Sequence, residues 1–267
     1  MRNLLFLLLI CCSYHAQAQE DSIQINTDRP GFSDYPKTIP KGYFQIEAGF
    51  SFESETTNLN DRIQLVNWNN TLVKYGLTAG WELRVSQTYQ SERLLEGRTS
   101  PEFVWQNSSG PIVLGTKIDL LKESGLVPQT AILAEYGINT LGSDQFESNR
   151  FYRIQISSKY HLNPEWYLMA NLGYDEQFNN FGRIRFTLNT GYSVNEELSV
   201  YAELYGFRSE FVTPLNYFDA GLTYLINPKF QLDLSAGFDL AKQVNNVENY
   251  QQSFIAVGLG YLFKIQK

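Results

Sequence analysis

The feature that most constrains this chain is an alternation of apolar and polar residues that runs from about Tyr43 to Phe263. It comes in segments of roughly ten residues, separated by turn residues. Successive side chains of a β-strand point to opposite faces, so each segment predicts a strand with one apolar face and one polar or small face. The last segment shows this most clearly, with Ile255, Val257, Leu259, Tyr261 and Phe263 on one face and Ala256, Gly258 and Gly260 on the other.

The N-terminus has the pattern of a secretory signal peptide. Arg2 provides a positive charge, Leu4 to Cys12 form a short apolar core, and Ala16-Gln17-Ala18 is a small-residue cleavage site. We therefore expect residues 1–18 to be removed, so that Gln19 begins the mature chain. The apolar run of about nine residues is too short to span a bilayer as a helix. Export combined with the alternating segments predicts a transmembrane β-barrel.

Two cysteines lie in this leader, and none follows them. Cys11 and Cys12 are expected to leave with the signal peptide, so the mature chain has neither a disulfide nor thiol chemistry. A lipid-anchored cysteine is the less favoured alternative, because the bulky Leu9 and Ile10 precede the pair.

Composition favours a barrel and argues against a nucleic-acid partner. Aromatic residues make up 15% of the chain, with 17 Tyr and 18 Phe, which suits a barrel with aromatic rims. After the leader, no stretch approaches the roughly 18 continuous apolar residues of a transmembrane helix. The formal charge is −7, or −8 without Arg2 (20 basic minus 28 acidic residues), whereas nucleic-acid binding requires a basic surface.

We predict an all-β fold, an antiparallel up-and-down transmembrane β-barrel of about 12 strands formed by residues 42–267. An even number of strands brings both ends of the barrel wall to the same side of the membrane. The predicted strands cover residues 42–54, 62–76, 80–92, 110–122, 127–139, 149–161, 165–177, 181–194, 197–210, 214–226, 229–242 and 251–265.

The connections between these strands alternate in length. Short turns of bacterial barrels lie on the periplasmic side and long loops lie outside. Counted from the first strand, every tight turn falls on the periplasmic side together with both ends of the wall. The tight turns are residues 77–79, 123–126, 163–164, 195–196 and 227–228, and the longer polar loops are residues 56–61, 93–109, 140–148 and 244–250.

Aromatic pairs flank several of the tight turns. The two members of each pair are six residues apart and share outward parity, as in one rim of an aromatic girdle at the lipid–water boundary. Cross-strand aromatic pairs in a soluble barrel or sandwich are the alternative. The pairs are Tyr75 with Trp81, Tyr160 with Trp166, and Tyr224 with Phe230.

Charged residues share the polar parity of the predicted strands and are expected to face the lumen. A charge that faces lipid at mid-bilayer costs about 2–4 kcal/mol, less for acids, which explains such sorting. Asn67 to Asn70 break the alternation of the strand at 62–76, so the pattern leaves its two faces unassigned. The candidate lumen and plug residues are Asp28, Arg29, Glu47, Glu82, Arg84, Lys117, Asp119, Glu135, Arg153, Arg185, Glu203, Asp219 and Asp233.

Several motifs resemble those of an outer-membrane barrel family labelled "MetA-pathway of phenol degradation", whose members are described as transporters. The resemblance covers nearly the whole mature chain, and it implies a barrel that passes small solutes, aromatic or apolar ones included. One departure lies at residues 138–142, where the family has P-x-G. The matching motifs are T-D-R-P at 27–30, P-K-G at 40–42, Q-x-E-x-G at 45–49, Y-G-L-T at 75–78, E-L-R at 82–84, L-G-T-K at 114–117 and Pro128.

The sequence offers little for catalysis, metal binding or a cofactor, and we expect none of the three. His161 is the only histidine after the leader. It has inward parity in a periplasmic turn and no evident serine partner, unlike the histidine of an outer-membrane Ser-His-Asn phospholipase. Metal sites need clustered His, Cys or carboxylate side chains, whereas the inward carboxylates here are spread over separate strands.

Residues 19–41 precede the barrel and have two possible roles. They are too poor in apolar residues to build a core, and Pro30, Pro36 and Pro40 favour an extended path. In one role they form a partial plug, with Asp28 and Arg29 bound to inward charges. Lys117, Asp119 and Asp233 are the predicted partners, because each lies in the strand half near a tight turn. In the other role the segment is a periplasmic leader that contacts nothing.

The sequence thus predicts a channel or transporter in the cell outer membrane of a Gram-negative bacterium, after cleavage of the signal peptide. The alternative is a non-conducting barrel with a structural or interaction role; an enzyme is the least favoured. The expected partners are outer-membrane lipid, a small-molecule solute and, during biogenesis, the barrel-insertion machinery.

Overall fold

The computed structural model describes residues 23–56, 62–95, 105–138, 151–177, 182–210, 214–240, 243–244, 247–248 and 251–265. The predicted signal peptide lies outside the described residues. Within them, no helix has the length and apolar character needed to cross a membrane.

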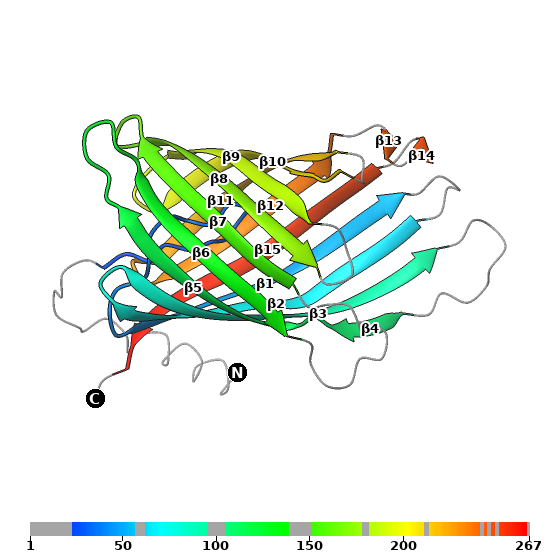
Figure 1. Cartoon of the computed structure of the whole chain (residues 1–267), viewed down its shortest axis with the longest axis horizontal. Coiled ribbons are helices and arrows are strands. Elements are labelled where there is room, and N and C mark those ends of the chain that lie inside the picture. Colours follow the sequence, from blue (N-terminus) through cyan, green and yellow to red (C-terminus); the bar gives the residue numbers. More distant parts are fainter. Residues whose placement is uncertain are drawn as a thin grey trace, which may run out of the picture.

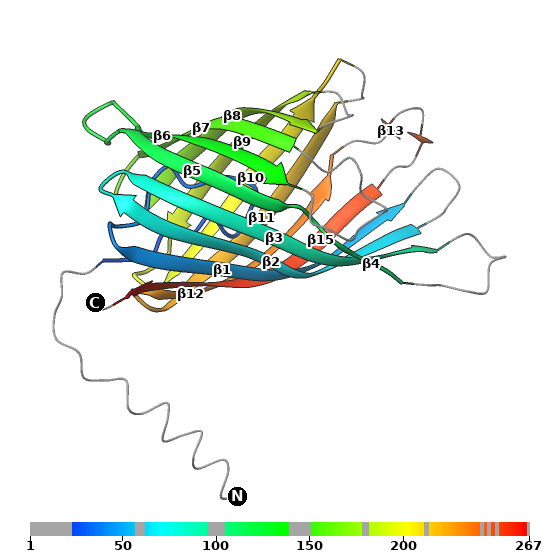
Figure 2. The ribbon, with the colours of Figure 1, turned by 60° about the horizontal axis from the view of Figure 1, so that its bottom comes forward.

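The described residues form a closed antiparallel barrel (Figures 1 and 2). Twelve strands make the ring, which closes between β2 and β3, and β4 is a short addition beside β3. The prediction of an antiparallel barrel of 12 strands is therefore confirmed. The strands are β1 (Tyr43–Thr56), β2 (Arg62–Thr78), β3 (Trp81–Leu95), β4 (Gln106–Ser109), β5 (Ile112–Leu121), β6 (Gln129–Ile138), β7 (Phe151–His161), β8 (Trp166–Gln177), β9 (Arg183–Ser193), β10 (Leu198–Arg208), β11 (Leu215–Asn227), β12 (Phe230–Asp239), β13 (Gln243–Val244), β14 (Val247–Glu248) and β15 (Gln251–Lys264).

Strands adjacent in sequence pair with each other around the ring, and the first pairs with the last. In β1 and β15, Tyr43 lies opposite Lys264 and Thr56 lies opposite Gln251. The barrel wall therefore begins and ends at one end of the barrel, which also carries the tight turns. We call this the turn end and the opposite one the loop end.

Parts of two predicted loops need correction. The predicted strand at 110–122 is observed as β5, but β4 lies within the predicted loop at 93–109, and both strands pair with β3. Part of that loop is thus strand. The interruption between β4 and β5 falls at Gly110 and Pro111, because proline has no backbone N–H to donate to the ladder. The small β13–β14 hairpin likewise overlaps the predicted loop at 244–250.

A bulge explains why the faces of β2 could not be assigned. The β2–β3 register shifts between Asn67 and Asn69, so Trp68 is an extra residue without a partner in β3. An extra residue reverses the parity of a strand. On the loop side of the bulge, Leu65 lies opposite Glu53, and on the turn side Lys74 lies opposite Gln45. The inward residues therefore change from odd to even numbers along β2.

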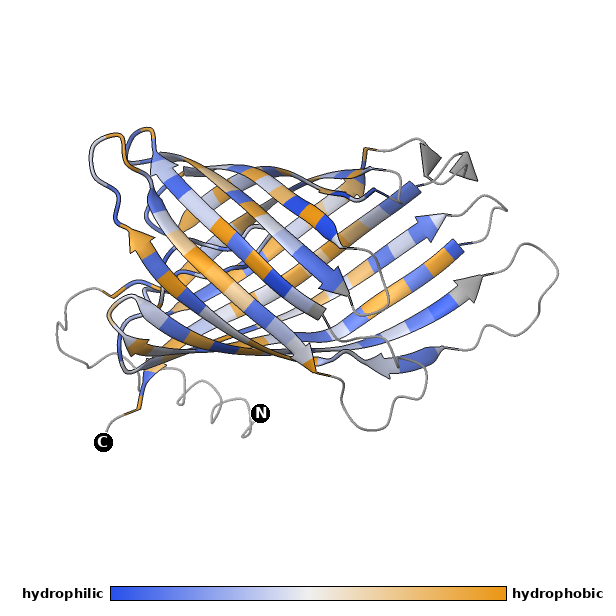
Figure 3. Ribbon diagram, in the orientation of Figure 1, coloured by the Kyte–Doolittle hydropathy of each residue, from blue (hydrophilic) through white to orange (hydrophobic). Residues whose placement is uncertain are grey.

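The two faces of the wall differ in chemistry. Polar and charged side chains are buried on the inner face, whereas large apolar side chains are exposed on the outer face. Along β12, for example, Leu232 and Leu234 are exposed while Asp233 and Ser235 are buried. Figure 3 shows the resulting alternation of hydrophobic and hydrophilic residues along the strands. The wall therefore has an apolar outside and a polar lumen.

The turn end is shaped by a repeated asparagine. The side-chain oxygen of Asn163 accepts backbone N–H bonds from Glu165 and Trp166, at 3.0 and 2.7 Å. Asn195 does the same for Glu197 and Leu198, at 2.9 and 2.7 Å. Such Asx turns close short hairpins without a glycine.

Candidate functional site

The N-terminal segment, residues 23–42, lies inside the barrel. It starts at the turn end, where Ile25 packs in an apolar cluster with Ile39, Tyr43 and Leu262. The end of the segment leads back to β1 and passes close to Gly76 of β2. An added Cβ at Gly76 would collide with the Pro40 carbonyl, so glycine permits this close approach. Figure 2 shows the segment, in dark blue, within the lumen near the turn end.

Two cavities lie on either side of the segment. The turn-end cavity has a volume of about 1040 Å³ and is lined by the segment and by β7 to β12. The loop-end cavity has a volume of about 380 Å³ and is lined by the segment and by β1 to β9 residues such as Arg153 and Arg185. Asp28, Arg29 and Ser33 line both cavities, so these residues lie between them.

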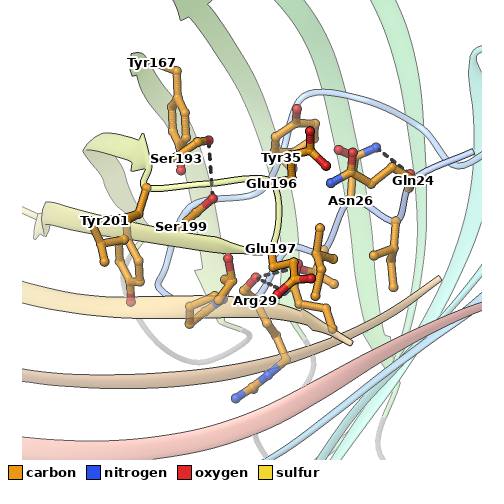
Figure 4. A pocket seen from close by; sticks show the side chains of 18 of the residues that line it. Gln24, Asn26, Arg29, Tyr35, Tyr167, Ser193, Glu196, Glu197, Ser199 and Tyr201 are labelled. Atoms are coloured by element: carbon orange, nitrogen blue, oxygen red, sulfur yellow. Dashed lines mark hydrogen bonds between the residues drawn. The ribbon is translucent and has the colours of Figure 1, made fainter. Parts of the chain in front are cut away.

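Figure 4 shows the turn-end cavity from close by. Asn26, Arg29 and Tyr35 reach it from the segment, while Tyr167 and Tyr201 reach it from the wall. The lining combines amide, hydroxyl and aromatic groups with charged side chains such as Arg29 and Lys159.

Asp28 is the centre of a buried ion network. Its carboxylate lies 2.7 Å from Lys74 Nζ, 3.0 Å from Arg84 Nη1 and 3.0 Å from Lys117 Nζ. Its backbone N–H donates to the carboxylate of Glu47, which also pairs with Lys74 at 2.5 Å. All of these side chains are at least nine-tenths buried.

The segment adds negative charge to this network. The wall supplies four cations to the connected ion pairs (Lys74, Arg84, Lys117 and Arg153) and three acids (Glu47, Glu82 and Glu135), so the wall alone carries one excess positive charge. The segment supplies negative charge to it through Asp28, which contacts three of the four cations. Removal of one partner from a buried ion pair is strongly destabilising, because the remaining charge is left without compensation.

Asp34, further along the segment, makes a second set of ionic contacts. Its carboxylate lies 3.2 Å from Arg84 Nη2 and 3.6 Å from Arg153 Nη2, and it accepts a 2.7 Å hydrogen bond from Gln155. Arg153 also pairs with Glu135 at 2.5 Å. We call this part of the lumen, formed by β1 to β7 around Asp28 and Asp34, the ionic side.

The same charges set the acidities of the two segment carboxyls. Burial alone would raise the pKa of Asp28, but Lys117, Lys74 and Arg84 outweigh burial and hold that pKa well below its ordinary value. Burial also acts to raise the pKa of Asp34, yet Arg153 and Arg84 outweigh it and lower that pKa to about 2. Both carboxyls are therefore ionised at neutral pH.

Arg29 contacts the wall through a hollow made by two glycines. Its guanidinium donates to both oxygens of Asp233, at 3.1 and 3.3 Å, and to the Val257 carbonyl at 3.2 Å. Gly49 and Gly258 lie opposite each other in β1 and β15. A Cβ at either position would collide with the guanidinium, so glycine at both is what lets Arg29 approach the wall.

The tip of the segment, Phe32 and Ser33, contacts a different surface, formed by β9 to β11. The Phe32 ring stacks on Tyr205, with centroids 4.6 Å apart and an interplanar angle of 8°. Tyr205 in turn stacks on Tyr217 at 4.9 Å. The Phe32 N–H donates to Glu203 at 2.5 Å, and the Ser33 hydroxyl bonds to Glu203 and, at 2.6 Å, to Thr187. We call this surface the aromatic side.

The thirteen residues predicted for the lumen comprise Asp28 and Arg29 of the segment, nine wall residues that bind the segment, and two wall residues that bind other wall residues. Arg29 and Asp233 form a pair, as do Asp28 and Lys117, whereas Asp119 binds the N–H and hydroxyl of Thr38, at 2.9 and 3.0 Å. Asp119 lies near the turn end, where the segment is already returning to β1. The residues that bind the segment are Glu47, Glu82, Arg84, Lys117, Asp119, Arg153, Arg185, Glu203 and Asp233; Glu135 binds Arg84 and Arg153, and Asp219 accepts from Tyr201 at 3.3 Å.

Three important contact residues were missed from the sequence. Lys74 was missed because the bulge at Trp68 hides the parity of β2. Ser33 and Asp34 lie in a segment without periodic pattern, so no rule of alternation applies to them. A charged residue between Val73 and Tyr75, near a tight turn, was the available signal for Lys74.

His161 contacts an acidic side chain and is not part of a metal site among the described residues. His161 Nδ1 lies 2.7 Å from Glu123 at the turn end. Among the described residues, no group of three or more His, Cys, Asp or Glu is placed to hold a metal ion.

The family model described as "Putative MetA-pathway of phenol degradation" matches residues 27–256. No curated protein sequence matches the chain. Among solved structures, the COG4313 outer membrane channel from Pseudomonas putida F1 has a TM-score of 0.67 at 13% identity, covering 88% of this chain and 100% of that chain. The translocator domain of the autotransporter NalP from Neisseria meningitidis has a TM-score of 0.52 at 10% identity, covering 98% and 96%. The toluene transporter TbuX from Ralstonia pickettii has a TM-score of 0.50 at 11% identity, covering 85% and 90%. The fold is thus that of outer-membrane barrels.

Proposed function

Because the chain belongs to the family of the MetA pathway of phenol degradation, we propose that it forms a channel for small solutes, aromatic and apolar compounds among them, in the outer membrane of a Gram-negative bacterium. The observation that carries the proposal is the pair of lumen cavities separated by the N-terminal segment. A lumen filled by the wall's own side chains would leave no such space. Aromatic groups in both halves of the lumen support the aromatic solute class, as does the likeness in fold to a toluene transporter.

In this proposal the chain has three parts. Residues 1–18 are a cleaved signal peptide, residues 19–41 are a partial plug, and residues 42–267 are the barrel. The turn end faces the periplasm, since short turns lie there in bacterial barrels. Lipid covers the outer wall, and the barrel-insertion machinery places the chain in the membrane. The lumen serves passage of a solute and not catalysis.

The competing function is a non-conducting barrel with a structural or interaction role. The contacts of the segment favour this alternative, because Asp28, Arg29 and Ser33 separate the two cavities. The two functions differ in whether the segment ever leaves its place.

Single-channel recording in planar lipid bilayers tests the proposal. The full-length protein should give small, infrequent currents, and a variant lacking residues 19–32 should give larger or longer ones, because it lacks Asp28, Arg29 and Phe32. Heat-dependent migration on a denaturing gel shows that each variant is a folded barrel. Unchanged currents from the folded deletion variant would contradict the plug, and the absence of current from both proteins would favour the non-conducting barrel.

A further inference from the structure

Phe32 lies in surroundings suited to any single aromatic ring. The face of Tyr205 is stacked on it at 4.6 Å, and the edge of Phe207 meets it at 5.6 Å and 89°. The Arg185 guanidinium lies 4.6 Å from the ring centroid. Stacked, edge-on and cation–π contacts are the arrangements that aromatic rings prefer. None of them depends on the ring being part of the chain.

The ring is also accessible. Phe32 is 37% exposed and lines the loop-end cavity, whose volume is about 380 Å³. A solute that enters the lumen from the loop end therefore reaches the Phe32 ring in a cavity that is also lined by charged residues such as Arg84 and Arg153. The ion network itself offers no apolar contact to such a solute.

Arg185 carries an unused hydrogen-bond donor at this position. It lines the same cavity and is 6% exposed. Its Nη2 donates to the Phe32 carbonyl at 3.4 Å, but its buried Nε has no hydrogen-bond partner among the described residues. Within those residues it also has no carboxylate within 4.0 Å, unlike Arg84 and Arg153. A buried donor without a partner is costly, so a ligand oxygen that satisfied it would be favoured.

We propose that Phe32 occupies a binding subsite for phenols, that is, for single aromatic rings with a hydroxyl group, and that a bound phenol displaces the Phe32 ring. The phenol ring then stacks on Tyr205 beneath Arg185, and its hydroxyl oxygen accepts from Arg185 Nε. This inference rests on the proposed channel function and adds the site at which the solute acts.

Displacement of the ring loosens the tip of the segment. The Phe32 backbone is hydrogen-bonded to Glu203 and Arg185, and the Ser33 hydroxyl is hydrogen-bonded to Glu203 and Thr187. A ring that moves away draws these backbone groups with it. Asp34 remains bound on the ionic side, so the movement is confined to the residues just before it. The solute thus opens its own path past the tip.

Binding is measured by fluorine NMR with para-fluorophenol on the full-length protein in detergent. We expect the probe signal to broaden, and phenol but not cyclohexanol to reverse the broadening. Phe32→Ala should bind the probe about two- to tenfold more tightly, the factor for removal of one stacked ring that competes for the site. Arg185→Gln should bind it several-fold more weakly. Phe50→Ala is the matched control, because Phe50 is 38% exposed on the outer wall.

Conductance provides the second readout. Phenol should raise the open probability of the wild-type protein at concentrations at which cyclohexanol has no effect, and Phe32→Ala should be open without phenol. Equal probe affinity in wild type, Phe32→Ala and Phe50→Ala would overturn the inference, even if the channel conducts. If no variant conducts but the predicted order of affinities is found, the channel function fails while the subsite stands.

Discussion

The two sides of the lumen hold the same segment by different means. On the ionic side, Asp28 and Asp34 are buried and each has at least two cations within 4.0 Å. On the aromatic side, Phe32 is itself 37% exposed and is held by stacking on Tyr205, and Ser33 is held by two hydrogen-bonded neighbours. Buried ion pairs are costly to break, whereas a stacked ring is worth about 0.5–1.5 kcal/mol. The ionic side therefore fixes the segment in the lumen, whereas the contacts on the aromatic side are the ones that break more easily.

The largest effect is expected from Asp28→Asn on the ionic side. It removes the negative charge that Lys74, Arg84 and Lys117 share, and removal of one partner from a buried ion network costs about 3–5 kcal/mol. The segment should leave the lumen, and the open probability in planar bilayers should rise strongly. Glu210→Gln, at an exposed position that lines neither cavity, is the control and should behave as wild type. An unchanged open probability in folded Asp28→Asn protein would show that the ionic side does not hold the segment.

Acid should act on the same side. The pKa of Asp34 is lowered from its ordinary 3.8 to about 2 in the docked state. A lowered pKa means that the contribution of Asp34 to docking is complete above pH 3.8 and is lost as the pH falls towards about 2. Currents should therefore increase over that window. Asp34→Asn should lose this part of the pH response, and an increase of current as the pH rises through the same window would contradict the assignment.

A smaller effect is expected from Ser33→Ala on the aromatic side. It removes the hydroxyl that bonds to Glu203 and Thr187, at a cost of about 1–3 kcal/mol for a lost hydrogen bond to a buried carboxylate. The open probability should rise, but by less than in Asp28→Asn. Ser199→Ala removes a hydroxyl from the wall of the turn-end cavity and is the matched control. The opposite order, with Ser33→Ala more open than Asp28→Asn, would reverse the comparison of the two sides.

The alternation of side chains made the barrel wall predictable. A period of two residues, combined with tight turns on one side, gave the ring of 12 strands, because pairing of neighbouring strands follows from short connections. The parity of Glu82 and Arg84 likewise placed both on the inner face, where they are buried. What alternation cannot show is a bulge. Trp68 adds one residue to β2, so Lys74 has a parity that only the paired strands reveal.

The aromatic side was not predictable in the same way. Phe32 and Tyr205 are far apart in the sequence and meet only after the ring has closed and the segment has folded into it. The segment has no periodic pattern, so only its charges pointed to partners on the wall. Charge complementarity did suggest Lys117 for Asp28 and Asp233 for Arg29, whereas a ring stack has no comparable sequence signal.

The central claim is that the tip of the segment closes the lumen, and a disulfide across the aromatic side tests it most directly. Ser33 Oγ and Thr187 Oγ1 are 2.6 Å apart, close enough for a cysteine pair to form a bond of about 2.05 Å with little rearrangement. The oxidised Ser33→Cys, Thr187→Cys protein should conduct less than wild type, and addition of a reductant should restore the currents. The two single-cysteine variants should not respond to reductant. Equal currents before and after reduction, from protein whose cross-link is verified on a gel, would contradict the account.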